Sequence, residues 1–63
     1  MINFKELFEF FGGRNKLCGQ LDVSNAAISA WKMADAIPPG NAVEIERITD
    51  GKFKAVDLVA KRG

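Results

Sequence analysis

Two apolar-patterned segments, residues 14–21 and 25–33, are separated by only three residues, and this spacing constrains the fold more than any other feature. Both segments place apolar residues at helical spacing, and so short a connection leaves room only for a tight turn. Val23 is placed to bury the turn, and Ser24 is a preferred N-cap for the second helix. The sequence therefore predicts two short crossing helices joined by a turn, a helix-turn-helix unit.

Close crossing of two helices requires a small residue where their backbones meet. Cys18 lies in the middle of the first predicted helix and shares a face with Leu17 and Leu21. Ile28, ten positions after Cys18, fills the crossing from the other side, and Trp31 follows on the same inward face. Trp31 is therefore interpreted as a core residue rather than a stacking or ligand-binding one. The outer face of the second helix remains free to contact a partner.

A further helix is predicted before this unit. Asn3 and Glu6 fit a capping box at its start, and Gly12-Gly13 ends it, because glycine tolerates the left-handed conformation found at helix C-termini. Its apolar stripe consists of Phe4, Leu7, Phe8 and Phe11.

A fourth helix is predicted after the unit. Pro38-Pro39-Gly40 indicates a chain reversal, and proline is well tolerated at the first position of a helix. We expect this helix from about Pro39 to Thr49, followed by a turn at Asp50-Gly51. Its inward residues are expected to be Ala42, Ile45 and Ile48.

The segment 52–63 fits two structures. Phe53-Lys54-Ala55-Val56 alternates like a strand, whereas Val56, Val59 and Ala60, with Lys61-Arg62 near the end, fit a short helix. We expect the helix, with an extended tail as the alternative. The predicted fold class is thus all-α, with four to five helices.

Size and composition limit the class of protein. The 63 residues, 48% of them hydrophobic, suit one small globular domain over residues 1–63. No apolar run approaches the roughly 20 residues of a membrane span, and the first residues are unlike a secretory signal. The single cysteine suits a reducing cytoplasm. The cysteine count and the lack of histidine remove the usual zinc ligand sets.

Function is less constrained by composition. No grouping of nucleophile, base or metal ligands indicates an enzyme, so we expect no catalysis, metal, cofactor or small-molecule ligand. The net charge of only +1 counts mildly against nucleic-acid binding, unless the nine Lys and Arg residues are placed asymmetrically.

Several short groups of residues match a known pattern: Phe11-Gly12, Leu17-Cys18, Leu21-Asp22-Val23-Ser24, Ala26-Ala27-Ile28-Ser29, Trp31-Lys32, Ile37-Pro38, Ala42, Ile45-Glu46, Ile48-Thr49 and Gly51. Through these residues the chain resembles the Cro repressors of lambdoid phages and their prophage relatives, notably the all-helical branch. The resemblance covers roughly residues 4–53 and departs from the common pattern at Asp22, where the turn usually has glycine. It implies a lambda-repressor-like fold and a homodimeric repressor that reads pseudo-palindromic operator DNA in the bacterial cytoplasm, at the nucleoid.

The resemblance also implies residue roles. Asn25 would pair with adenine, and alanine methyls would touch thymine methyls; the simpler reading is that Asn25 supports the helix start and that the alanines favour the helix. The expected base contacts are Asn25, Ala26, Ser29 and Ala30. The expected phosphate contacts are Arg14, Asn15, Lys16, Lys32 and Asn41, which could otherwise be solvated surface groups or, for Asn41, a helix cap.

The expected dimer interface contains Phe53, Val56 and Val59. Two other functions remain open at this point: a small helical protein-interaction module, which the near-neutral charge favours, and an antitoxin-type regulator with the same fold. The polar outer face of the second helix of the unit favours DNA over an apolar groove on a partner protein.

Overall fold

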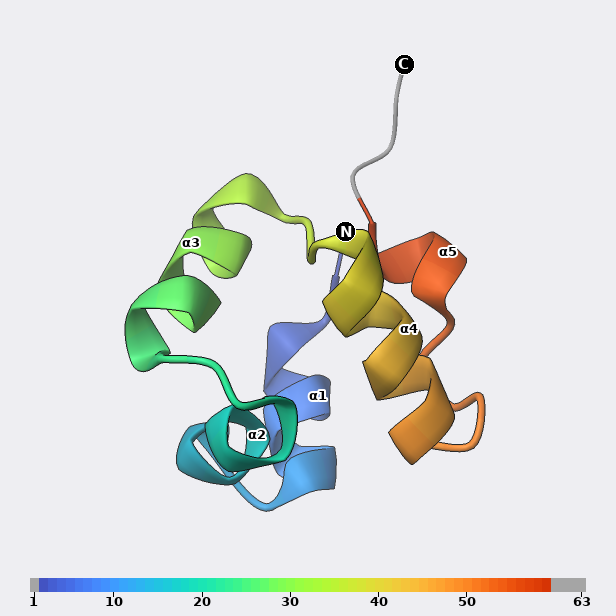
Figure 1. The fold of residues 1–63 in the computed structure, drawn as a ribbon, viewed down its shortest axis with the longest axis horizontal. Coiled ribbons are helices and arrows are strands. Elements are labelled where there is room, and N and C mark those ends of the chain that lie inside the picture. Colours follow the sequence, from blue (N-terminus) through green and yellow to red (C-terminus); the bar gives the residue numbers. More distant parts are fainter. Residues whose placement is uncertain (1, 60–63) are drawn as a thin grey trace.

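The computed structural model describes residues 2–59, and its regular structure is entirely helical (Figure 1). This confirms the all-α fold class. The five helices are α1 (Phe4–Phe11), α2 (Arg14–Leu21), α3 (Asn25–Ala34), α4 (Pro39–Ile48) and α5 (Ala55–Leu58).

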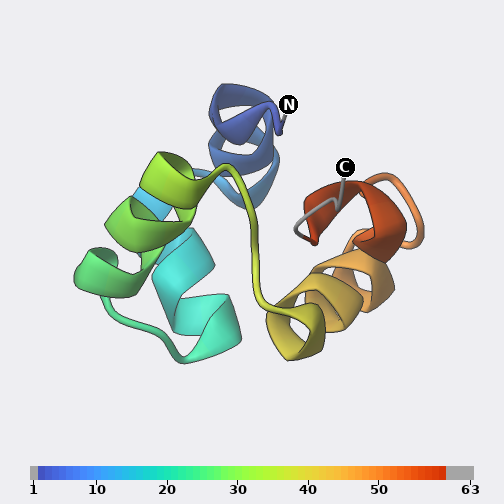
Figure 2. The ribbon, with the colours of Figure 1, turned by 90° about the horizontal axis from the view of Figure 1, so that it is seen from above.

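The helices form two groups on either side of the core. Figure 2 shows α1, α2 and α3 on one side and α4 and α5 on the other, with the segment before α4 crossing between them. The amide of Ile37 in this crossing segment donates to the carbonyl of Leu58 at 2.7 Å. Because α3 lies at the outer edge of its group, its outward face is not covered by another helix (Figures 1 and 2).

One hydrophobic core joins both groups, and it contains most of the residues that the periodicity placed inward. Leu7, Leu17, Ile28, Ile37 and Ile45 are completely or almost completely buried. Trp31 is also buried, which confirms its interpretation as a core residue. Cys18, Phe8, Phe11 and Ile48 are only partly buried against this core. None of the helices over residues 2–59 is long and apolar enough to cross a membrane.

Local sequence signals explain where the helices begin and end. The side chain of Asn3 accepts a hydrogen bond from the Glu6 amide at 3.0 Å, and Gly12 ends α1 in the left-handed conformation. Asp22, at the position where the turn usually has glycine, ends α2 in the left-handed conformation with φ of 56°. A short polar side chain such as that of aspartate tolerates this conformation better than most residues do.

Ser24 confirms its predicted role as the N-cap of α3, because its hydroxyl oxygen accepts from the Ala27 amide at 3.1 Å. We expect Ser24→Ala to lower the free energy of unfolding by about 1 kcal/mol, since an amide at the helix start loses its partner. Urea denaturation measures this change. Ser24→Asp keeps a capping acceptor and should retain wild-type stability; equal stability of all three proteins would contradict the capping role.

The tail corrects part of the sequence prediction. Residues 53–56 form no strand, so the expected helix was right, but α5 is a single turn whose buried residue is Leu58. Val56, which the predicted apolar spacing included, is 73% exposed. Ala60 and Lys61-Arg62 lie outside the described residues.

The position of α5 is fixed by hydrogen bonds from α4. The Glu46 carboxylate accepts from the Ala55 amide at 2.7 Å. The buried Thr49 hydroxyl donates to the Ile45 carbonyl at 2.8 Å and accepts from the Phe53 amide at 3.3 Å. These contacts tie the start of α5 to the end of α4.

Candidate nucleic-acid interface

The outer face of α3 is exposed and consists of small or flexible side chains. At helical spacing, Ala26 and Met33 lie along its centre, and Met33 is 90% exposed. Asn25 and Ser29 form one edge, toward α2, and Ala30 lies on the opposite edge. The structure thus places all four predicted base-contact residues on exposed positions of α3. Met33, which lies two helical turns after Ala26, is not among the residues predicted to contact DNA.

The edge formed by Asn25 and Ser29 is connected to α2 by Arg14. Arg14 Nε donates to Asn25 Oδ1 at 2.8 Å, and Nη2 donates to the Asn25 carbonyl at 2.7 Å and to Ser29 Oγ. The Asn25 amide nitrogen also donates to Asn15 Oδ1 at 3.4 Å. Arg14 and Asn15, predicted to contact phosphate, therefore belong to one hydrogen-bonded cluster with two of the predicted base contacts.

Phe8 on α1 supports two cationic side chains beside this cluster. Arg14 Cζ and Lys32 Nζ each lie 6.0 Å from the centroid of its ring. An aromatic face attracts cations at about this distance. The apolar spacing predicted only a core role for Phe8, but its half-buried ring also contacts Arg14 and Lys32 on the same side of the molecule.

The start of α2 offers backbone donors. Its N-cap is Gly13, which supplies no side-chain hydrogen bond, so the first amides of the helix have no capping side chain to accept from them. Such amides, together with the helix dipole, attract anions. Asn15 and Lys16 are exposed at this end. Asn41 lies apart from it, in the first turn of α4, and the structure shows no side-chain cap there.

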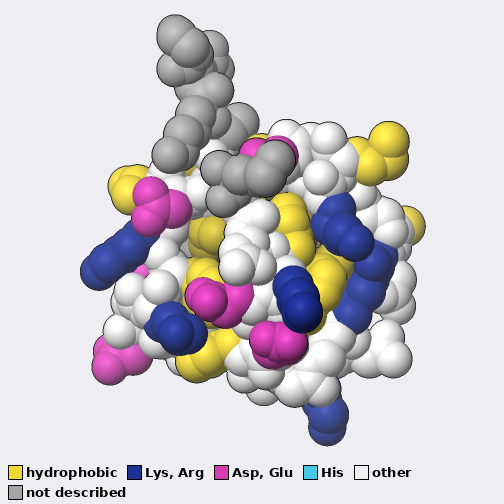
Figure 3. Space-filling view, turned by 180° about the vertical axis from the view of Figure 1, so that it is seen from behind, with side chains coloured by type: hydrophobic (Ala, Val, Ile, Leu, Met, Phe, Trp, Pro, Cys, Tyr) yellow, Lys and Arg dark blue, Asp and Glu magenta, His cyan; other side chains and the backbone are white. Residues whose placement is uncertain are grey.

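The charges of the described residues are distributed asymmetrically. Residues 14–34 contain three Lys or Arg and one Asp, whereas the rest of residues 2–59 contain four Lys or Arg and seven Asp or Glu. Figure 3 shows several basic side chains and no acidic ones near the edge on the α3 side, whereas basic and acidic side chains are mixed toward the centre and the opposite edge. The asymmetric placement of Lys and Arg that nucleic-acid binding requires at so low a net charge is therefore present within the described part of the chain.

One basic residue of the acidic region is paired. On α4, Arg47 hydrogen-bonds Glu44, which lowers the pKa of Glu44 and raises the pKa of Arg47. Both side chains are exposed, so this pair contributes little to stability.

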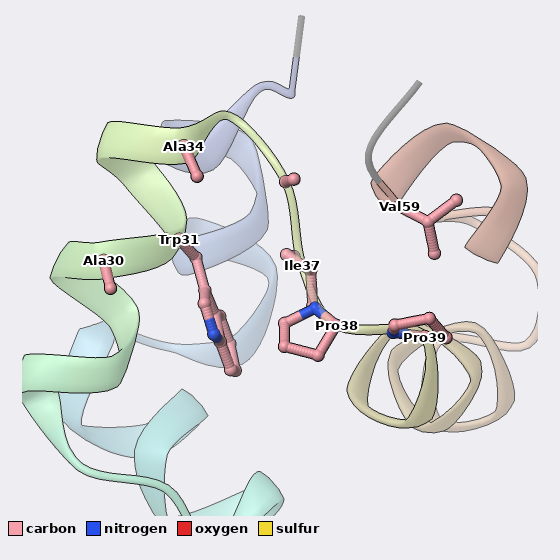
Figure 4. A pocket seen from close by; sticks show the side chains of 8 residues that line it. Ala30, Trp31, Ala34, Ile37, Pro38, Pro39 and Val59 are labelled. Carbon is pink, nitrogen blue, oxygen red and sulfur yellow. The ribbon is translucent and has the colours of Figure 1, made fainter. Parts of the chain in front are cut away.

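An open apolar groove of about 670 Å³ lies between the end of α3 and the start of α4 (Figure 4). Ala30 on α3 and Val59 after α5 both line it, together with Trp31, Pro38 and Pro39. Ala30, predicted to contact bases, thus borders this groove as well as the outer face of α3.

The predicted dimer residues have different surroundings. Phe53 packs edge-to-face on Phe10, with ring centroids 5.9 Å apart. Val56 is largely exposed, and Val59 is half-buried in the groove.

A short α2, a tight turn and an α3 whose outer face is free define a helix-turn-helix DNA-binding protein. A family model described as DNA-binding transcriptional regulator Cro matches residues 3–63. The chain therefore belongs to the Cro family of DNA-binding transcriptional regulators. No curated protein and no solved structure matched the chain.

Proposed function

We propose that the protein represses transcription by binding a pseudo-palindromic operator as a homodimer, with α3 of each protomer in the major groove. The observation that carries this proposal is the free outer face of α3, made of small and polar side chains and flanked by basic ones. Such a face fits base edges and backbone phosphates better than it fits an apolar surface of another protein.

In this arrangement the outer face of α3 contacts bases and the flanking groups contact phosphates. The proposed base contacts are Asn25, Ala26, Ser29 and Ala30, with Met33 added by its exposure. The proposed phosphate contacts are Asn15, Lys16, Lys32 and Asn41, together with the uncapped amides at the start of α2. Arg14 belongs to the same surface.

A dimer binds two half-sites of the operator, whereas one small domain binds only one. We place the contacts between protomers at Phe53, Val56 and Val59, of which Val56 exposes the most apolar surface. A two-fold dimer places its recognition helices about 34 Å apart, in successive major grooves. The bound dimer blocks RNA polymerase, in the cytoplasm at the bacterial nucleoid, without a cofactor or small-molecule ligand.

Selection of bound sequences from a random DNA pool tests this proposal. We expect an enriched inverted repeat whose half-site centres are about 10 base pairs apart. Enrichment of a single half-site would contradict the dimer, and no enrichment at all would contradict sequence-specific binding and favour a protein-interaction module.

A further inference from the structure

Some N–H groups of the Arg14 guanidinium make no hydrogen bond to residues 2–59 after the others have bound α3. A guanidinium has five N–H groups in a fixed planar arrangement. Nε and Nη2 use three of them on Asn25 and Ser29. The two N–H groups of Nη1 make no hydrogen bond within residues 2–59, and the ring of Phe8 supports the guanidinium. Arg14 is thus a rigidly held donor beside the outer face of α3.

The hydrogen bonds from Arg14 also engage the side-chain oxygens of Asn25 and Ser29, which form the edge of α3 toward α2. Asn25 Oδ1 accepts from Arg14 Nε and lies 3.7 Å from Cys18 Sγ, a weak donor. The Asn25 amide nitrogen retains one N–H after donating to Asn15, and the Ser29 hydroxyl retains its own proton while it accepts from Arg14. The groups left to face DNA on this edge are therefore mostly donors.

The two purines differ in the hydrogen-bond donors and acceptors that they present in the major groove. Guanine presents two acceptors, N7 and O6, whereas adenine presents one acceptor and one donor. An asparagine that reads adenine needs a free acceptor position on its side-chain oxygen. The two acceptor positions of Asn25 Oδ1 are used by Arg14 Nε and, more weakly, by Cys18 Sγ. We propose that Arg14 is a specificity-determining residue that makes this edge of α3 select guanine over adenine, by presenting Nη1 and by holding the Asn25 oxygen. This inference rests on the proposed function.

Selection from a random DNA pool with wild type, Arg14→Ala and Lys16→Ala tests the inference. We expect wild type to enrich guanine at one position of each half-site, with a preference over adenine of about tenfold or more. Arg14→Ala should abolish this preference, and adenine should gain at that position because the Asn25 oxygen is released. Adding Asn25→Ala to Arg14→Ala should remove the gain of adenine at that position.

Lys16→Ala is the control. It should keep the whole base profile, while the slope of binding affinity against salt concentration becomes shallower by about one unit.

Phosphate oxygens also accept hydrogen bonds, and the experiment distinguishes a phosphate contact of Arg14 from a guanine contact. If Arg14→Ala weakens binding equally on every sequence and leaves the base profile unchanged, Arg14 contacts only the backbone and the inference is overturned. If Arg14→Ala does not fold by circular dichroism, Arg14→Met replaces it, because methionine can still pack on the Phe8 ring but has no N–H group to give to guanine or to Asn25. An unchanged guanine preference in that variant also overturns the inference. A wild-type profile with an inverted repeat but no guanine at such a position overturns the inference alone, and the lack of any enriched sequence overturns the proposed function with it.

Discussion

Ala26→Glu is expected to lower operator affinity by about 100-fold or more, while the fold stays intact. Ala26 is exposed on the outer face of α3, where a carboxylate would face phosphates and base acceptors; like charges in an interface cost several kcal/mol. In a dimer the loss occurs in both half-sites. The new side chain lies in the first turn of α3, where a negative charge is favourable for the helix dipole. Gel-shift titration and thermal unfolding measure the two effects.

Val43→Glu is the matched control for this variant. Val43 is 59% exposed on α4, so the same change of charge is made away from α3. We expect its operator affinity to remain close to that of wild type at physiological salt, where charges separated by more than about 8 Å are largely screened. Equal losses in both variants would indicate that only the net charge matters and would contradict a recognition role for α3.

Ile28→Ala is expected to lower the free energy of unfolding by about 2–5 kcal/mol, because it leaves a cavity at the crossing of α2 and α3. Ile28 is completely buried. Small domains have only about 5–15 kcal/mol of total stability, and those of this size lie toward the lower end. A large fraction of the variant should therefore be unfolded at 37 °C, as urea titration and circular dichroism would show.

Two further substitutions assign this loss to the core. Met33→Ala also shortens an apolar side chain of α3, but Met33 is 90% exposed, so its stability should change by less than about 0.5 kcal/mol. Ile28→Val removes one methylene and should cost about 0.5–1.5 kcal/mol. Alanine has a higher helix propensity than methionine or isoleucine, so comparable destabilisation by Met33→Ala and Ile28→Ala would contradict the assignment of the loss to burial at the crossing.

The residues that set helix boundaries were predictable because each acts within a few positions along the chain. Ser24 caps the helix that follows it, and Asp22 takes the positive φ of a turn. Contacts between distant segments were not predictable in this way. The hydrogen bonds of Arg14 to α3 and of the Ala55 amide to Glu46 depend on how whole helices pack. The sequence therefore indicated which face of α3 is exposed, but not which of its polar atoms remain free.

The tail shows a second physical limit on prediction. One helical turn contains too few residues for periodicity to identify its inward side. Leu58 is the buried residue of α5, whereas the equally apolar Val56 faces outward. The choice follows from the position of the end of α4 rather than from the tail itself.

The separation of basic and acidic groups has a kinetic consequence. With an excess of basic residues over 14–34 and an excess of acidic residues in the rest of 2–59, the molecule is an electrical dipole even though its net charge is only +1. In the field of a polyanion such a molecule experiences a torque that turns the α3 side toward the nucleic acid before contact. Orientation in this way raises the fraction of productive encounters, and added salt weakens it. The association rate should therefore depend more steeply on ionic strength than the net charge suggests.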